Sequence, residues 1–132
     1  MSVGERLTAL RNDLLKARQA LKDAGREQYE LMAMDIYRRL RQAWERAVEE
    51  VLLNSTVVRF NDSVQTQRLK RLTDISDTDV QTVTKEMSRC SDFFHDEAGV
   101  LHASPPDPDV IEDDITRLAA WVKHLRTHRG RS

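Results

Sequence analysis

The chain has 132 residues, a length that fits one domain with a single modest hydrophobic core. Charged residues make up 33% of it and hydrophobic residues 39%, with only four glycines and three prolines. This balance favours a soluble, helix-rich protein over a sheet protein or a disordered chain. The formal net charge of -1 excludes a global attraction to nucleic acid, membranes or acidic substrates, although the C-terminal segment LRTHRGRS is locally basic.

The single cysteine, Cys90, excludes an intramolecular disulfide and a cysteine-based zinc framework. No apolar run approaches the length of a membrane span, and no signal-peptide core follows Met1. We therefore expect a cytoplasmic protein that has no membrane partner.

The first half of the chain carries two helical patterns. Residues 4–23 place apolar side chains at three- and four-residue steps, and Gly25 follows as a natural stop. Residues 26–54 keep helical phase throughout and contain no helix breaker before Asn54. The second pattern predicts a long central helix.

The next segment, residues 55–75, is ambiguous. STVVRF fits either a continued helix or a short strand because valine favours extended backbone, and QTQRLKRL fits one or two helical turns. A third helix is predicted over 77–94. Ser76 and Asp79 have the spacing of a capping box, and an apolar stripe that includes Cys90 follows them.

The last helix is predicted over 107–128. Asp107 followed by Pro108 is a favourable pair for the N-cap and the first turn, and the apolar residues that follow share one helical face. Four helices with short connections predict an all-α helical bundle that forms one domain over residues 1–132.

The common site classes lack their signatures in this sequence. It has no GxxxxGK[ST] loop, no GxGxxG motif after a strand and no HExxH. His124 and His128 are four residues apart, but they have no evident third ligand, so a basic helix end is favoured over a metal site. We expect neither a metal nor a cofactor.

Cys90 lies on an apolar stripe, which predicts a buried structural thiol.

One set of polar residues could form a site for RNA cleavage without a metal. Arg46 and Glu50 are one helical turn apart in WERAVEE, and Arg89 and His95 bracket CSDFF. Cleavage needs a base for the ribose 2′-hydroxyl and an acid for the leaving oxygen, and histidine titrates near neutrality. Arginine can bind the negative charge of the transition state, and a carboxylate can orient the arginine. The alternative is a solvated salt bridge and a histidine at a helix end.

Four stretches occur in order that carry a family resemblance: DIYRRLRQAWERAVEEVLLNSTVVRF, SVQTQRLKRLTDI, MSRCSDFFHD and PDPDVIEDDITRLAAWVKHLR. Together they resemble the C-terminal helical region of coiled-coil, ABC-type ATPases of the AAA family. Those ATPases are related to the anticodon nucleases PrrC and RloC of phage-defence loci. The resemblance covers about residues 10–128. It implies a HEPN-like helical ribonuclease domain that dimerises, with two active-site copies facing a shared cleft.

The resemblance also implies roles for individual residues. PrrC-like nucleases use an arginine and a glutamate one helical turn apart, which correspond here to Arg46 and Glu50, and a later histidine, which corresponds to His95. HEPN domains carry an arginine followed after four to six residues by a histidine, and Arg89 and His95 match this with five residues between them. The sequence departs from the family in having Cys90 where a polar residue usually follows that arginine, and in containing no ATPase half.

Two functions follow as alternatives. The first is a metal-independent ribonuclease domain, directed at tRNA, in which His95 is the general acid or base, Arg46 and Arg89 bind phosphate and Glu50 orients them. Its expected partners are RNA, an ATPase subunit or domain, and a second copy of the chain. The second is a non-catalytic helical module that docks on, dimerises or regulates its ATPase partner. An antitoxin-like inhibitor of a related nuclease is not separable from the second by sequence.

Overall fold

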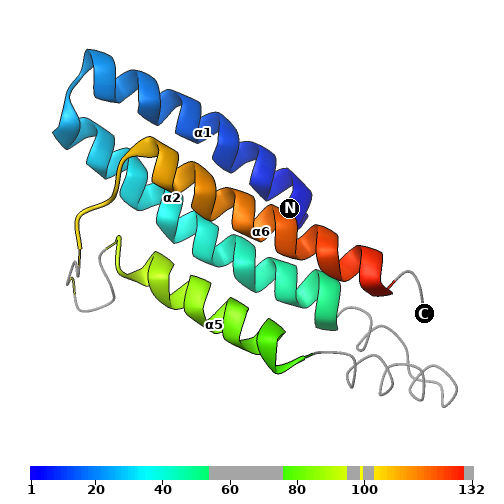
Figure 1. Ribbon diagram of the computed structural model, residues 1–132. Coiled ribbons are helices and arrows are strands. Elements are labelled where there is room, and N and C mark those ends of the chain that lie inside the picture. The colour runs from blue at the N-terminus through cyan, green and yellow to red at the C-terminus, as the bar shows by residue number, and fades with distance from the viewer. Residues whose placement is uncertain (54–75, 95–98, 100–102, 130–132) are drawn as a thin grey trace, which may run out of the picture.

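The computed structural model describes residues 1–53, 76–94, 99 and 103–129. These residues form an all-α bundle, which confirms the predicted fold class (Figure 1). The ambiguous segment 55–75 lies outside the described residues, as does His95. The elements in chain order are α1 (Val3–Asp23), α2 (Arg26–Ala47), the π-helical segment η1 (Val48–Leu53), α5 (Asp77–Ser91) and α6 (Pro108–Arg129).

Helix α2 is the centre of the bundle. It packs against α1, α5 and α6, and α6 packs in addition against α1 (Figure 1). Helices α1 and α5 lie on opposite sides of α2 (Figure 1). The long helix predicted from the sequence therefore contacts each of the other three helices.

The α1–α2 corner follows directly from local sequence chemistry. Ser2 and Glu5 form a capping box at the start of α1, in which the Glu5 amide donates to Ser2 Oγ at 3.1 Å and the Ser2 amide donates to Glu5 Oε1 at 3.3 Å. Helix α1 ends at Asp23, and Gly25 has a φ of 98°, a conformation in which a residue with a Cβ would be strained. The predicted stop at Gly25 is thus the point where the chain reverses.

The core is built from the apolar faces of all four helices. Two aromatic pairs lie within it: the ring centroids of Trp44 and Trp121 are 5.3 Å apart, and those of Tyr37 and Phe93 are 4.6 Å apart. The other buried hydrophobic residues are Val3, Leu10, Leu14, Ala17, Tyr29, Ala33, Ile36, Leu40, Ala43, Ala47, Cys90, Ile111, Ile115, Leu118, Val122 and Leu125.

The helix that was predicted over 26–54 changes character near its end. The α-helical part stops at Ala47, and the chain continues as the π-helical segment η1 (Val48–Leu53). Hydrogen bonds in a π-helix span five residues instead of four. The spacing of apolar residues over six positions does not reveal this difference. π-Helical segments are frequent at functional sites.

Helix α5 begins as predicted and ends earlier. The capping box is present, because the Asp79 amide donates to Ser76 Oγ at 3.1 Å and the Ser76 amide donates to Asp79 Oδ2 at 3.2 Å. The helix ends at Ser91 instead of residue 94. The amides of Asp92 and Phe93 each donate at 3.1 Å to a carbonyl three residues back, a tighter turn that closes the helix.

Candidate functional site

Arg46 and Glu50 lie together at the end of the bundle where α2 passes into η1. Arg46 Nε donates to Glu50 Oε1 at 2.9 Å, so the predicted one-turn pair is in contact. The other carboxylate oxygen of Glu50 accepts from the Val3 amide at 3.2 Å and lies 3.6 Å from Arg126 Nη2. The side chain of Glu50 is only 13% exposed. One carboxylate therefore connects α1, α2 and α6 and fixes the direction of the Arg46 guanidinium.

A hollow of about 470 Å³ lies beside this pair, between the start of α1 and the end of α2. We call it the α1/α2 hollow, and its lining residues are Met1, Arg6, Gln42, Glu45, Arg46 and Glu49. Within this lining, Arg46 Nη1 donates to Glu49 Oε2 at 3.2 Å. The hollow thus combines two guanidinium groups, one primary amide and two carboxylates.

Arg89 is engaged elsewhere. Its Nε donates to Asp114 Oδ1 at 2.7 Å and its Nη2 donates to Asp114 Oδ2 at 3.2 Å, a two-point pair with a carboxylate that is 2% exposed. The guanidinium also lies over the Phe93 ring, 5.2 Å from its centroid. These contacts give Arg89 a structural role between α5 and α6.

The predicted site residues are therefore divided between two places. Arg89 contacts Asp114 and Glu50 lies near Arg126, and these two partners are twelve residues apart on α6. At 1.5 Å per residue, the two positions are separated by about 18 Å along the helix axis. The structure brings Arg46 and Glu50 together and leaves Arg89 apart from them, whereas His95 lies outside the described residues.

A ladder of polar contacts joins α5 to α6, and we call it the polar ladder. In addition to the Arg89–Asp114 pair, Arg117 Nε donates to Glu86 Oε1 at 2.5 Å, and Trp121 Nε1 donates to Asp79 Oδ1 at 3.3 Å. Asp114 also accepts hydrogen bonds from Arg117 and from the Tyr37 hydroxyl. Sequence reasoning missed this network. Its signal was present, because Glu86 and Asp114 interrupt the apolar stripes of their helices at core-facing positions.

Cys90 is buried beneath α5, as the sequence predicts. Burial raises the pKa of its thiol to about 12, so the thiol is protonated at neutral pH and is a poor nucleophile.

His124, from the predicted basic helix end, lies on the exposed side of α6. Within the described ranges, no group of three or more His, Cys, Asp or Glu side chains is arranged to hold a metal ion.

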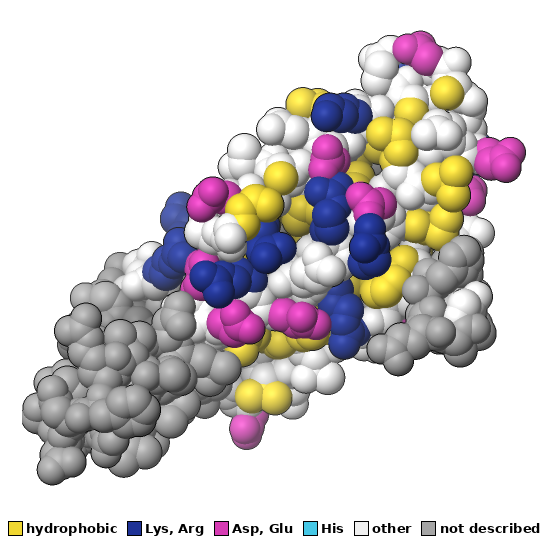
Figure 2. Space-filling view, turned by 180° about the vertical axis from the view of Figure 1, so that it is seen from behind, with side chains coloured by type: hydrophobic (Ala, Val, Ile, Leu, Met, Phe, Trp, Pro, Cys, Tyr) yellow, Lys and Arg dark blue, Asp and Glu magenta, His cyan; other side chains and the backbone are white. Residues whose placement is uncertain are grey.

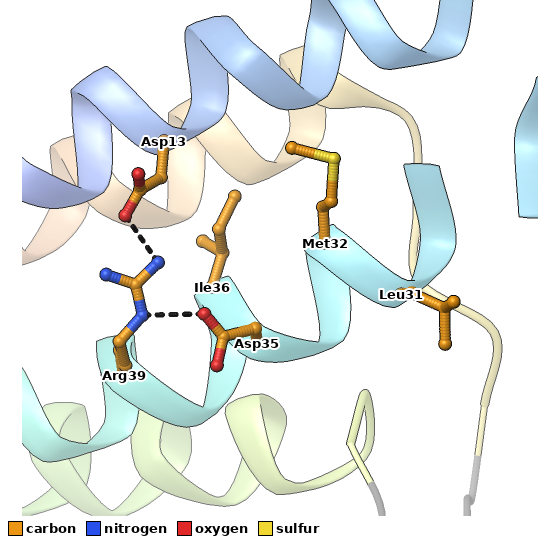
Figure 3. Close-up of a pocket in the computed structure, with 6 residues that line it drawn as sticks. All are labelled: Asp13, Leu31, Met32, Asp35, Ile36 and Arg39. Atoms are coloured by element: carbon orange, nitrogen blue, oxygen red, sulfur yellow. Dashed lines mark hydrogen bonds and ion pairs between the residues drawn. The ribbon is translucent and has the colours of Figure 1, made fainter. Parts of the chain in front are cut away.

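A second hollow, of about 560 Å³, lies between α1 and α2 nearer the α1–α2 corner (Figure 3). Arg39 crosses one side of it, with Nη2 at 2.5 Å from Asp13 and Nε donating to Asp35 at 2.9 Å (Figure 3). The remaining lining is apolar and consists of Leu31, Met32 and Ile36. We call it the apolar hollow.

Comparisons with known proteins give no further identification. No family model matches the sequence, and no curated protein or solved structure is significantly similar to it. Among the described helices, none combines the length and the apolar character that a membrane crossing requires.

Proposed function

We propose that this chain is a HEPN-like, metal-independent ribonuclease domain, directed at tRNA and associated with an ATPase partner in phage defence. The ordered sequence blocks that resemble the PrrC- and RloC-related ATPases motivate this proposal. The structural observation that supports it is the contact of Arg46 with Glu50 at 2.9 Å beside the α1/α2 hollow. A guanidinium that is held by a carboxylate and borders an open hollow suits the binding of a phosphodiester.

In this mechanism, a base removes the proton of a ribose 2′-hydroxyl, and the 2′-oxygen attacks the adjacent phosphorus. The bond from phosphorus to the 5′-oxygen breaks, and an acid gives that oxygen a proton. The products are a 2′,3′-cyclic phosphate and a 5′-hydroxyl end. His95 carries out one of the two proton transfers, Arg46 binds the phosphate oxygens and Glu50 orients Arg46. Arg89 pairs with Asp114 in another part of the bundle, away from Arg46 and Glu50, so we assign it a stabilising role.

The test is cleavage of total tRNA in the presence of EDTA, with and without an ATPase partner. We expect the wild-type protein to release fragments that end in a cyclic phosphate. His95→Ala and Arg46→Ala should each cleave at least about 100-fold more slowly. Arg38→Ala is the matched control, because Arg38 lies on the same helix and its ion pair within the described part of the chain is with the half-exposed Asp35. Equal cleavage by wild type and His95→Ala, or no cleavage under any of these conditions, would overturn the proposal.

We propose as a second candidate a non-catalytic module that forms a homodimer through α1 and α2. The observation that favours it is the exposure of two leucines on these helices, Leu15 at 65% and Leu31 at 56%, the second of which lines the apolar hollow. Sedimentation equilibrium should give a dimer for wild type and a monomer for Leu31→Asp. Val80→Asp, on α5 and similarly exposed, should remain a dimer. A monomeric wild type would exclude this candidate.

A further inference from the structure

We infer that Arg6 is a second phosphate-binding residue of this chain, acting in the α1/α2 hollow on an RNA phosphate next to the one that Arg46 binds. The inference rests on the proposed action on RNA and adds a residue of α1 to the site. Neither the family resemblance nor the acid–base pattern of the sequence includes Arg6.

Arg6 has no hydrogen-bond or ion-pair partner for its guanidinium among the described residues. Its Nε is buried and makes no hydrogen bond, and no ion pair of its guanidinium is found in the described part of the chain. A buried N–H group without an acceptor is unfavourable, and such groups in folded proteins are rare enough to need an explanation. Arg6 also lines the hollow, so an anionic oxygen there can bind the terminal Nη groups of its guanidinium.

The two carboxylates that line the hollow are already paired with other arginines. Glu49 accepts from Arg46 at 3.2 Å, and Glu45 lies 3.7 Å from Arg41. Of the two arginines that line the hollow, Arg46 is paired with carboxylates and Arg6 is not, among the described residues. The Arg6 guanidinium therefore adds attraction for an incoming anion.

The lining of the hollow combines two arginines with two carboxylates. On the face of the bundle drawn in Figure 2, separated basic side chains lie among acidic ones. A spread of separated cations over a surface matches a polyanion with repeated charges better than a single small anion. The exposed Gln42 amide, which lines the same hollow, adds a donor and an acceptor that can meet a ribose or a base edge. An RNA strand satisfies both features.

The experiment measures binding of a fluorescein-labelled single-stranded RNA by anisotropy at several salt concentrations. All variants carry His95→Ala, so that RNA is not consumed. We expect Arg6→Gln to weaken binding about tenfold, because a hydrogen bond to a charged group is lost. The slope of log affinity against log salt should become shallower by about 0.7, the value for one phosphate contact on a single strand. Arg6→Lys, which keeps the charge, should retain the slope.

The matched control is Arg11→Gln, which removes an exposed arginine from another face of α1 and should change neither affinity nor slope. Unchanged binding by Arg6→Gln would overturn the inference. So would equal losses from Arg6→Gln and Arg11→Gln, or a large loss of thermal stability in Arg6→Gln, since the last result would give Arg6 a structural role. If tRNA is not cleaved but the Arg6 effect is found, the ribonuclease proposal fails while the RNA site stands. If tRNA is cleaved and Arg6→Gln binds normally, only the inference fails.

Discussion

Asp114→Ala should lower the free energy of unfolding by about 3 kcal/mol, as expected when one partner of a buried ion pair is removed. Asp114 accepts hydrogen bonds from Arg89, Arg117 and the buried Tyr37 hydroxyl, and all three donors would lose their acceptor. The estimate is at the low end of the usual range because the Arg89 side chain is 34% exposed and stays partly hydrated. Urea denaturation followed by circular dichroism measures the change.

The control for this substitution is Asp113→Ala, one residue earlier on the exposed face of α6. It should change the free energy of unfolding by no more than about 0.5 kcal/mol. If Asp114→Ala prevents folding altogether, Asp114→Asn gives a milder perturbation of the same contacts. A loss below about 1 kcal/mol for Asp114→Ala would contradict a stabilising role for the polar ladder.

Trp44→Ala should be similarly severe and lower the free energy of unfolding by about 4 kcal/mol, because it leaves a large cavity at the centre of the bundle. Trp44 is fully buried, and its ring is tilted by 48° against that of Trp121. Its indole Nε1 makes no hydrogen bond to the described residues, so Trp44→Phe removes volume without leaving one of their acceptors unpaired. We expect about 1.5 kcal/mol for that change.

The comparison that tests this account is Trp121→Phe. Trp121 Nε1 donates to the buried Asp79 carboxylate at 3.3 Å, so this substitution leaves Asp79 with one fewer donor and should cost about 1 kcal/mol more than Trp44→Phe. The two single variants are compared by denaturation under the same conditions. A larger loss from Trp44→Phe than from Trp121→Phe would contradict the assignment of hydrogen bonds to the two indoles.

The sequence predicted the fold from features that act over short distances. Apolar spacing defined the four helices, the Ser76–Asp79 spacing defined the start of α5, and Gly25 defined the reversal after α1. The predictions were less accurate where hydrogen bonding departs from the α-helical pattern. The π-helical segment η1 and the tight turn that closes α5 after Ser91 have no signature in apolar spacing.

The candidate site was predictable only in part. Arg46 and Glu50 were found because one helical turn separates them, so local geometry ensures that they meet. The partner of Arg89 was not found, because Asp114 is distant in sequence and its position depends on how α5 packs against α6. Arg6 was missed for the same reason: the hollow that it lines exists only when α1 and α2 are packed together.

The polar ladder also determines how far α5 can slide along α6. Because the two helices are antiparallel across these contacts, a shift of α5 by one turn would move Glu86 into the place of Arg89, opposite Asp114. Glu86 and Asp114 would then face each other with Arg117 alone to balance the two buried carboxylates, which disfavours that register. Purely apolar faces would tolerate such a shift far better. The buried charges thus favour one axial position of α5 along α6. A buried polar residue fixes the register of a coiled coil in the same way.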